Sequence, residues 1–227
     1  MFFAEVNMVE KRQVFFSFYY ARDAWRASQV RNIGTITNDE PLSDNDWEEV
    51  KKGGDAAIKK WIDEQLQMRS CTVVLIGQET ASRPWIDYEI QKSWELGKGI
   101  VGICIHNLKD RDGTQAPKGE NPFAKFKVDG KPLMDIIETH CEEVWADSKD
   151  VYAAIQDNIA QWVEQAIEIR NGQPENSRIV NVSKLNNLGA KLGNALKNGA
   201  LGVSGAGIIT TVTPGTGHAT AFYGTVE

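Results

Sequence analysis

The sequence has 227 residues, enough for one large domain or for one medium domain with an appendage. Hydrophobic residues make up 41% and charged residues 25%, which are ordinary proportions for soluble proteins and argue against general disorder and against a polytopic membrane protein. The formal net charge is −6, and residues 1–170 alone carry 21 basic and 29 acidic side chains, or −8. An acidic globular part has no electrostatic reason to bind nucleic acid, so no such partner is expected.

The cysteines and the N-terminus bear on the cellular compartment. Cys71, Cys104 and Cys141 are an odd number without a CxxC or CxxH spacing, and two of them lie inside apolar runs. We expect three reduced thiols in the core. The N-terminal stretch is too short and too acidic for a secretory signal, which needs a basic start and a longer apolar region. A cytoplasmic location is therefore expected.

Three apolar runs predict strands. Residues 14–19 are β-branched and aromatic, while residues 71–77 and 100–106 are almost continuously apolar. Such runs are typical of strands that are covered on both faces of a parallel sheet. Residues 133–144 fit either a last strand or a short helix, and their pattern does not decide between the two.

Helical patterns separate these runs. Residues 21–31 suit a short helix, residues 46–66 a long amphipathic one with an aspartate as N-cap, and residues 151–167 a final one. Gly53 and Gly54 interrupt the long helix, and each glycine costs about 1 kcal/mol against alanine in a helix interior. We expect a kink or a close approach of another element there.

Strands that alternate with helices predict an α/β fold, a three-layer sandwich around a parallel sheet. In such sheets ligands bind at the carboxyl ends of the strands. Three loops are expected to meet at that edge: the loop after the first strand, residues 32–45 and residues 78–83. The last of these leads into a helix that begins at Pro84, since proline presets φ for a first helical turn, and that carries Glu89.

The composition changes after Arg170, which predicts a domain over residues 11–170 and a separate extension over residues 171–227. The extension holds ten of the twenty glycines and has four basic against two acidic side chains. It also contains a small-residue amphipathic helical pattern, marked by Leu185, Leu188, Leu192 and Leu196. A later apolar stretch, residues 200–214, falls short of the ~20 strongly apolar residues of a membrane span. We expect a packing or oligomerisation arm or, alternatively, a membrane-active element.

Most common catalytic motifs are missing from the sequence, among them the P-loop, HExxH, GxSxG and a strand followed by GxGxxG. The three histidines, His106, His140 and His218, lie far apart and have no ligand-type spacing to a cysteine or an acid, so neither a metal site nor a histidine triad is expected. Glu89 is different, because a buried helical stripe on either side of it places its carboxylate at the edge of the core. The alternative on spacing alone is a solvated helix glutamate.

An ordered set of motifs resembles a known family. In chain order the motifs are RQVFFSF at 12–18, DW at 46–47, GD at 54–55, VVLIG at 73–77, SRPW at 82–85 and YEI at 88–90. This set resembles TIR-like domains, and among them the bacterial branch that includes the TIR proteins of Thoeris anti-phage systems. The likeness covers residues 11–170 and leaves the extension outside.

The resemblance implies a flavodoxin-like sheet and an enzyme that cleaves the nicotinamide–ribose bond of NAD+, with Glu89 matching the family's catalytic glutamate. Cleavage develops oxocarbenium character on the ribose, which one carboxylate beside the sugar can stabilise. Nicotinamide leaves as a neutral group, so NAD+ is expected as substrate, with no cofactor and no metal. Hydrolysis, cyclisation and conjugation stay open as the next step.

Loop position and family likeness together suggest further substrate contacts. Three residues at the end of the first strand would wall the ribose and nicotinamide, an arginine would meet a phosphate, a tryptophan would stack on a ring, and a serine would bond the substrate or cap the helix. With a second tryptophan one turn before Glu89, the set is Phe16, Ser17, Phe18, Arg22, Trp47, Ser82 and Trp85.

The implied biology is an anti-phage enzyme that oligomerises, responds to a phage-derived trigger and makes an ADP-ribose-derived signal for a downstream effector. Two alternatives remain. One is a non-enzymatic TIR-like interaction module in which the low-charge extension is the working part. The other is a nucleoside-processing enzyme of similar topology that also uses a single glutamate.

Overall fold

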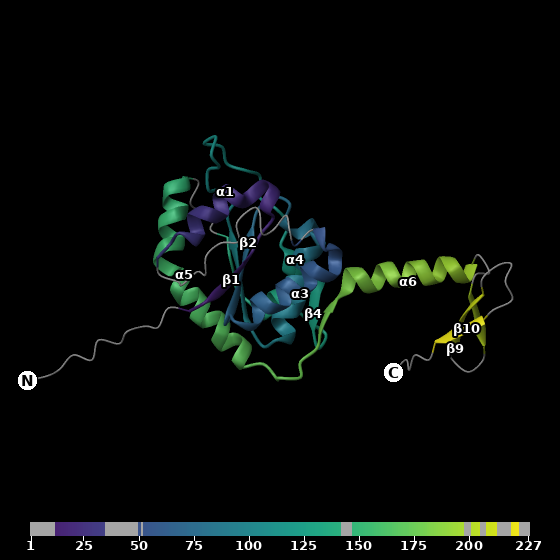
Figure 1. Ribbon diagram of the computed structural model, residues 1–227. Coiled ribbons are helices and arrows are strands. Elements are labelled where there is room, and N and C mark those ends of the chain that lie inside the picture. The colour runs from purple at the N-terminus through teal and green to yellow at the C-terminus, as the bar shows by residue number, and fades with distance from the viewer. Residues whose placement is uncertain are drawn as a thin grey trace, which may run out of the picture. The chain divides into compact units, whose positions relative to one another are not determined.

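The computed structural model describes residues 12–34, 50, 52–141 and 147–197, together with three short strands farther along the chain at 201–204, 208–212 and 219–222. The chain divides into two units, Met1–Val180 and Asn181–Glu227 (Figure 1). Each unit is described by itself.

A four-stranded parallel sheet forms the centre of the first unit. Its strand order is β1-β2-β3-β6, and every neighbouring pair is parallel. The apolar runs of the sequence supply the first three strands, and both central strands are buried along their whole length. The strands are β1 (Val14–Ser17), β2 (Cys71–Ile76), β3 (Gly99–Cys104) and β6 (Thr139–His140).

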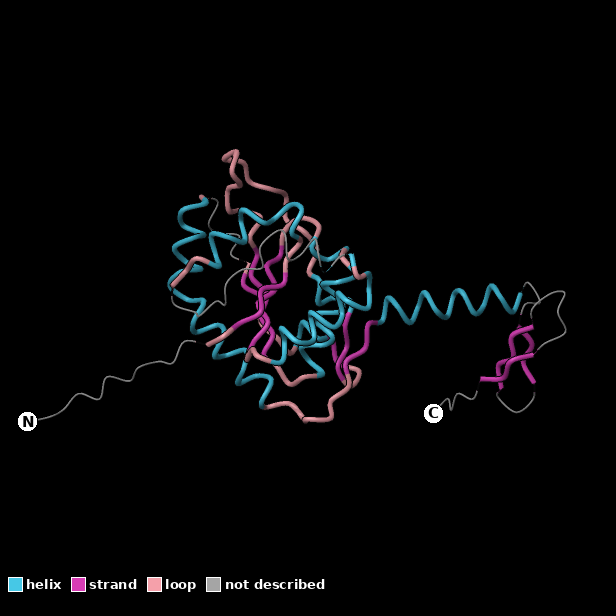
Figure 2. Tube along the Cα trace, viewed as in Figure 1, coloured by secondary structure: helices cyan, strands magenta, loops and turns pink. Residues whose placement is uncertain are grey.

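Helices cover both faces of this sheet, as Figure 2 shows. On one face, α1 (Tyr20–Arg31) and α5 (Ser148–Asn171) bury their apolar side chains against alternate residues of the strands. On the other face lie α3 (Gly54–Gln67) and α4 (Pro84–Glu95) with their own clusters. The predicted three-layer α/β fold is confirmed.

The predicted interruption at Gly53 and Gly54 is the start of a helix. Gly54 has a φ of +71°, a left-handed conformation that glycine adopts without strain from a Cβ, and α3 begins at this residue. Residues 46–49 and 51, the first part of the predicted long helix, lie outside the described residues.

Short elements after β3 complete the first unit. A second sheet has the order β5-β4-β7 and consists of β4 (Phe126–Val128), β5 (Lys131–Pro132) and β7 (Ile179–Asn181). The 3-10 helices η2 (Pro122–Lys125) and η3 (Leu133–Asp135) also follow β3, whereas η1 (Thr80–Ser82) lies earlier, between β2 and α4. The stretch 133–144 therefore holds both a short helix and a short strand, with residues 142–144 outside the description.

The first unit extends beyond Arg170, where the composition places the boundary. α5 continues to Asn171, and Ile179 of β7 is buried in the same cluster as the inward stripe of α4. The side chain of Ser177 also accepts a hydrogen bond from the Trp94 indole at 3.1 Å. The division therefore lies at Val180/Asn181.

The second unit begins with α6 (Val182–Lys197), which spans the leucine pattern read from the sequence. An antiparallel sheet of order β10-β9-β8 follows, made of β8 (Leu201–Ser204), β9 (Ile208–Val212) and β10 (Ala219–Phe222). These strands were not predicted, because glycine, serine and threonine dilute the alternation of apolar residues. None of the helices that the structure describes is both long and apolar enough to cross a bilayer.

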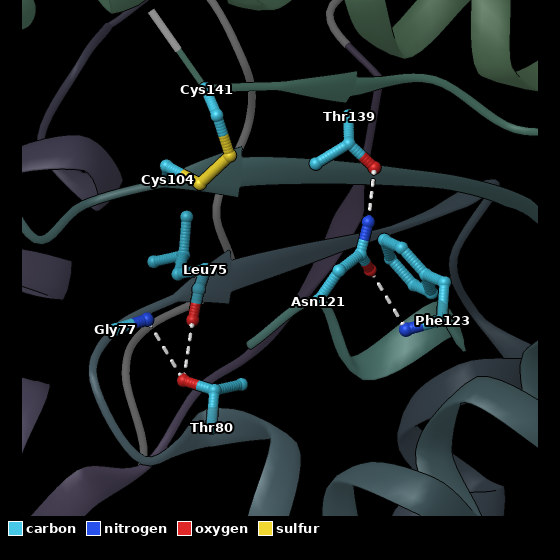
Figure 3. Close-up of a disulfide and its surroundings, with 8 residues drawn as sticks. All are labelled: Leu75, Gly77, Thr80, Cys104, Asn121, Phe123, Thr139 and Cys141. Atoms are coloured by element: carbon cyan, nitrogen blue, oxygen red, sulfur yellow. Dashed lines mark hydrogen bonds between the residues drawn. A yellow bond between two sulfur atoms is a disulfide. The ribbon is translucent and has the colours of Figure 1, made fainter. Parts of the chain in front are cut away.

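The expectation of three reduced thiols is wrong for two of them. Cys104 and Cys141 form a disulfide between the ends of β3 and β6, with their Cα atoms 4.8 Å apart (Figure 3). The two residues are 37 positions apart, and only the parallel pairing of their strands brings them together. Cys71 is free and fully buried, and burial raises the pKa of its thiol.

Candidate active site

Glu89 is carried by a helix whose start is fixed locally. Arg83 is extended, with φ −96° and ψ 119°, and Pro84 then occupies the first turn of α4. Ile86 and Ile90 lie in the buried stripe that packs on the sheet. Glu89, next to this stripe, is only 8% exposed, which excludes the solvated helix glutamate that spacing alone also allowed.

The Glu89 carboxyl meets the end of β1. The Ser17 hydroxyl donates a hydrogen bond to Glu89 Oε2 over 2.5 Å, and Ser17 is 1% exposed. Burial raises the pKa of Glu89 to about 8, because water no longer stabilises the carboxylate, while the bond from Ser17 opposes the shift by favouring the charged form. A carboxyl group with such a pKa can change its protonation state near neutral pH.

The main chain of Glu89 has its own anchor. The Ser93 hydroxyl donates to the carbonyl oxygen of Glu89 over 2.6 Å, and Ser93 Oγ lies 2.6 Å from Thr72 Oγ1 on β2. All three side chains are buried. Our sequence reasoning missed both hydroxyls. Ser93 follows Glu89 by one helical turn, which is a usable signal, whereas nothing in the sequence pairs Thr72 with it.

A lysine holds the turn that leads into α4. Lys125 Nζ donates to Asp87 Oδ1 and to the carbonyl oxygen of Ala81, both over 2.5 Å. These two acceptors lie on either side of the Arg83–Pro84 step. Farther along the helix, the Tyr88 hydroxyl donates to Asp63 of α3 over 2.8 Å. Two elements besides the sheet, η2 and α3, therefore fix the helix that carries Glu89.

Two arginines converge on one carboxylate at the carboxyl ends of β1 and β2: Arg22 lies in the first turn of α1, and Arg83 lies directly before α4. Arg22 Nε lies 2.9 Å from Glu79 Oε1, and Arg83 forms an ion pair with the other oxygen of Glu79. The Arg83 guanidinium also lies 3.7 Å from the centre of the Tyr19 ring. Two guanidinium groups therefore face one carboxylate at this edge of the sheet.

Two comparisons of the sequence with known proteins show its family. The model of the family described as Thoeris protein ThsB, TIR-like domain, matches residues 15–110. A relative from Bacillus cereus (strain MSX-D12), named "Putative cyclic ADP-D-ribose synthase ThsB1", is 42% identical over 132 residues, which cover 54% of this chain and 68% of the relative. The chain belongs to the Thoeris ThsB TIR-like family. The resemblance read from the motifs is thereby confirmed, and the family match includes Ser17 and Glu89.

Other residues predicted for the site of this TIR-like protein are spread over both faces of the sheet. Ser17 faces α4, whereas Phe16 and Phe18 pack in the cluster on the α1/α5 face, because side chains alternate along a strand. Trp85 lies beside the α3/α4 cluster and meets Tyr88 edge-on, with ring centroids 6.1 Å apart.

The polar members of the predicted set have protein partners. Arg22 has a half-exposed side chain that pairs with Glu79 and also donates to the side-chain oxygen of Gln78 over 3.0 Å. The hydroxyl of Ser82, an exposed residue, donates to the Glu79 carbonyl oxygen over 2.8 Å and does not cap α4. Trp47 lies outside the described residues.

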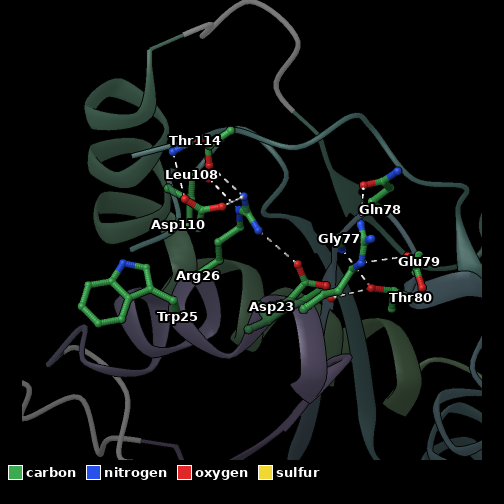
Figure 4. Close-up of polar contacts among 12 residues, drawn as sticks. Asp23, Trp25, Arg26, Gly77, Gln78, Glu79, Thr80, Leu108, Asp110 and Thr114 are labelled. Atoms are coloured by element: carbon green, nitrogen blue, oxygen red, sulfur yellow. Dashed lines mark hydrogen bonds and ion pairs between the residues drawn. The ribbon is translucent and has the colours of Figure 1, made fainter. Parts of the chain in front are cut away.

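A buried ion cluster ties α1 to the loop that follows β3 in this TIR-like domain (Figure 4). Arg26, 4% exposed, donates to the carbonyl oxygens of Leu108 and Thr114, each over 2.8 Å, and to Asp110 over 3.1 Å. Asp23, 2% exposed, lies 3.6 Å from the same guanidinium. Burial raises the pKa of Asp23, and Arg26 partly opposes this shift. Our sequence reasoning missed this cluster.

A small cavity lies at the carboxyl ends of β3 and β6, near the disulfide. Its lining includes His106, His140 and Trp162, and the His140 and Trp162 rings stack with centroids 4.0 Å apart. Glu89 does not line it. Within the part of the chain that the structure describes, no set of three or more His, Cys, Asp or Glu side chains is arranged to hold a metal ion.

Proposed function

We propose that this TIR-like protein cleaves the nicotinamide–ribose bond of NAD+ and forms a cyclic ADP-ribose-type signal in anti-phage defence. The observation that carries the proposal is the buried Glu89 carboxyl, bonded to Ser17 at the carboxyl edge of a parallel sheet. The name of the Bacillus cereus relative, a cyclic ADP-D-ribose synthase, supports the reaction type.

Bond cleavage places a positive charge where Glu89 can stabilise it. When the bond between C1′ and the nicotinamide nitrogen breaks, nicotinamide leaves as a neutral molecule with the electron pair, and the ribose becomes oxocarbenium-like. A carboxylate held in a buried setting stabilises this charge more than a solvated one, because the surroundings screen it less. The cationic ring of bound NAD+ also favours the ionised form of Glu89.

Cyclisation requires that the same molecule traps the ribose. An atom of the adenosine part donates an electron pair to C1′, a new bond replaces the one to nicotinamide, and any proton on the attacking atom goes to solvent. Water at the same position would give linear ADP-ribose instead. The protein favours the cyclic product to the extent that it folds NAD+ back on itself and keeps water out.

The proposal includes the surroundings of the reaction. NAD+ is substrate and no separate cofactor is required, since the leaving group is neutral. We also propose a homo-oligomer, a phage-derived trigger and a downstream effector that binds the product, in the cytoplasm where NAD+ is available. The guanidinium groups of Arg22 and Arg83, which can bond phosphate oxygens, support contact with the diphosphate of NAD+.

The test is a product assay on the purified full-length chain. We expect nicotinamide release from NAD+, followed by chromatography, and a second product one water lighter than ADP-ribose by mass spectrometry. Assays at low and high protein concentration, with and without extract of phage-infected cells, separate a resting enzyme from an inactive protein. Glu89→Gln is expected to lower release by about a hundredfold or more.

A matched control comes from the same helix. Glu95 of α4 is exposed, so Glu95→Gln should leave nicotinamide release unchanged. Release that survives Glu89→Gln would contradict the proposal. A cellular defence phenotype that survives Glu89→Ala would favour the interaction module, and cleavage of nucleosides without cleavage of NAD+ would favour the nucleoside-processing enzyme.

A further inference from the structure

Glu89 is held at two separate points by hydroxyl groups from two strands. Ser17 of β1 bonds its carboxylate, and Thr72 of β2 contacts Ser93, which bonds its main-chain carbonyl oxygen. All of these side chains are at least nine-tenths buried. β1 and β2 are neighbours in the parallel sheet, so both anchors rest on one rigid element.

We propose that Ser17 is a positioning residue, which acts on the Glu89 carboxylate rather than on the ribose. Thr72 and Ser93 are its counterpart for the main chain. This inference rests on the proposed function and deepens it. The bond from Ser17 orients the Glu89 carboxylate, and the bond from Ser93 holds the helix turn that carries it.

The directions of the side chains support this assignment. On a strand, only alternate residues face the same layer, so Ser17 faces α4 whereas Phe16 and Phe18 face α1 and α5. Its hydroxyl lies 2.5 Å from Glu89 Oε2, within the distance range of a hydrogen bond between a hydroxyl and a carboxylate. A hydroxyl that close to the carboxylate holds Oε2 in place and so limits the rotation of the carboxylate group.

The charged groups on the elements around Glu89 are engaged elsewhere. Asp63 of α3 accepts from Tyr88 and lies 3.9 Å from Lys92, and Lys125 bonds Asp87. Arg83, at the start of α4, pairs with Glu79. Among these described contacts, Ser17 alone reaches the Glu89 carboxylate, so its hydroxyl is the group whose loss should change the behaviour of that carboxylate.

The experiment measures the titration of Glu89 directly and does not depend on activity. Carboxyl carbons of 13C-labelled glutamate are followed by NMR across pH in the full-length protein, and the Glu89→Gln spectrum identifies the resonance. We expect a titration near pH 8 in the unchanged protein. Ser17→Ala should move it to higher pH, because a bond that favours the carboxylate is lost. Ser17→Thr keeps a hydroxyl and should restore it.

Kinetics provide the second readout. Ser17→Ala should lower kcat for nicotinamide release by about tenfold to a hundredfold, while KM for NAD+ changes little and the pH limb of kcat/KM moves upward. Ser93→Ala and Thr72→Val should lower kcat without moving that limb. Ser28→Ala on α1, where the hydroxyl donates to the Trp25 carbonyl oxygen, is the control that changes nothing.

Each outcome decides between roles. A raised KM with an unmoved titration would assign Ser17 to the substrate and overturn the proposal, as would an NMR titration of Glu89 that is the same in Ser17→Ala. If no nicotinamide is released under any condition, the proposed function fails, yet the NMR titration still tests the Ser17 bond. If Ser17→Ala does not fold, Ser17→Cys, which keeps the side-chain volume with a weaker donor, takes its place and should shift the titration in the same direction.

Discussion

The carboxylate of Asp23 lies against the Cα atom of Gly77, where a side chain at position 77 would begin. A Cβ atom built on Gly77 would come within 2.1 Å of Asp23 Oδ2, far inside van der Waals contact. The carboxylate has little freedom to withdraw, since it is 2% exposed and faces Arg26. The turn after β2 and the first turn of α1 are thus in contact without room for a methyl group.

Gly77→Ala should therefore destabilise the fold by about 1–3 kcal/mol, the usual penalty for inserting a methyl group into a packed interior. Urea unfolding would measure it. Gly34→Ala is the matched control, because a Cβ there meets none of the described residues within 4 Å and should leave the midpoint unchanged. Equal midpoints for the two variants would show that the Asp23 contact is not tight.

The pH dependence of stability should report the burial of Glu89. The pKa of this carboxyl is about 8 in the folded protein against 4.5 for a free glutamate. Between these values the folded state keeps a proton that the unfolded state releases, so stability falls as pH rises, by about 1.4 kcal/mol for each pH unit. Glu89→Gln removes this dependence and should be more stable than the unchanged protein above about pH 8.

Urea unfolding of both proteins at about pH 5 and about pH 9 checks this expectation. The difference in unfolding free energy should widen in favour of Glu89→Gln at the higher pH. Glu95→Gln, on the exposed side of α4, should follow the unchanged protein at both values. Parallel behaviour of all three proteins would mean that Glu89 is solvated.

Arg26 should be far more important to stability than an exposed arginine. Removing one partner of a buried ion pair leaves the other charge uncompensated, so Arg26→Met should cost about 3–5 kcal/mol. It should also raise the pKa of Asp23 further, because the opposing charge is gone. The double variant Asp23→Asn/Arg26→Met should lose less than the sum of the single variants.

Arg12 offers the comparison. It pairs with Glu164 at 2.8 Å, but both side chains are more than one-third exposed, so Arg12→Met should cost under about 1 kcal/mol. Calorimetric melting of the two arginine variants would rank them. Similar losses for both would contradict the buried role of Arg26.

Reduction of the disulfide should destabilise the first unit. The bond between Cys104 and Cys141 closes a loop of 37 residues, and the chain-entropy model assigns roughly 3–4 kcal/mol to a loop of that length. Melting with and without a reductant, and of Cys104→Ser/Cys141→Ser, should show the loss. A reductant that leaves the melting temperature unchanged, with free thiols counted by mass spectrometry after alkylation, would contradict the expected contribution.

Most of the extension, the second unit Asn181–Glu227, can be removed at the boundary that the structure defines. Deleting residues 181–227 spares most of β7, whose Ile179 belongs to the core, and should leave a folded α/β unit. If the extension is an oligomerisation arm, sedimentation velocity should show smaller species after the deletion. An unchanged oligomeric state would remove that role.

Local patterns in the sequence predict the layers well. Continuous apolar runs gave β2 and β3, and Pro84 marked the start of the helix that carries Glu89. Each of these signals lies within the element that it predicts. They were sufficient for the parallel sheet and for the place of Glu89 at its edge.

Pairings between distant residues escaped prediction for a physical reason. The Thr72–Ser93 contact, the Cys104–Cys141 bond and the contacts of Arg26 with Leu108 and Thr114 depend on which strands and loops become neighbours. A serine, a threonine or an arginine is polar at any position in the sequence. Its spacing from neighbouring residues therefore does not indicate which residue far along the chain it will contact. The alternation of side chains along a strand does predict that Ser17 and Phe16 face opposite layers. The expectation that Phe16, Ser17 and Phe18 together line the substrate did not take it into account.

β1 has only four residues, Val14–Ser17, and each faces the layer opposite to that of its neighbours. Inserting or deleting one residue here would turn the serine toward α1 and α5 and a phenylalanine toward Glu89. A substitution in β1 leaves the facing of the other residues unchanged, whereas an insertion or a deletion does not. Relatives that keep the chemistry should therefore differ in this strand by substitutions alone, and not by insertions or deletions.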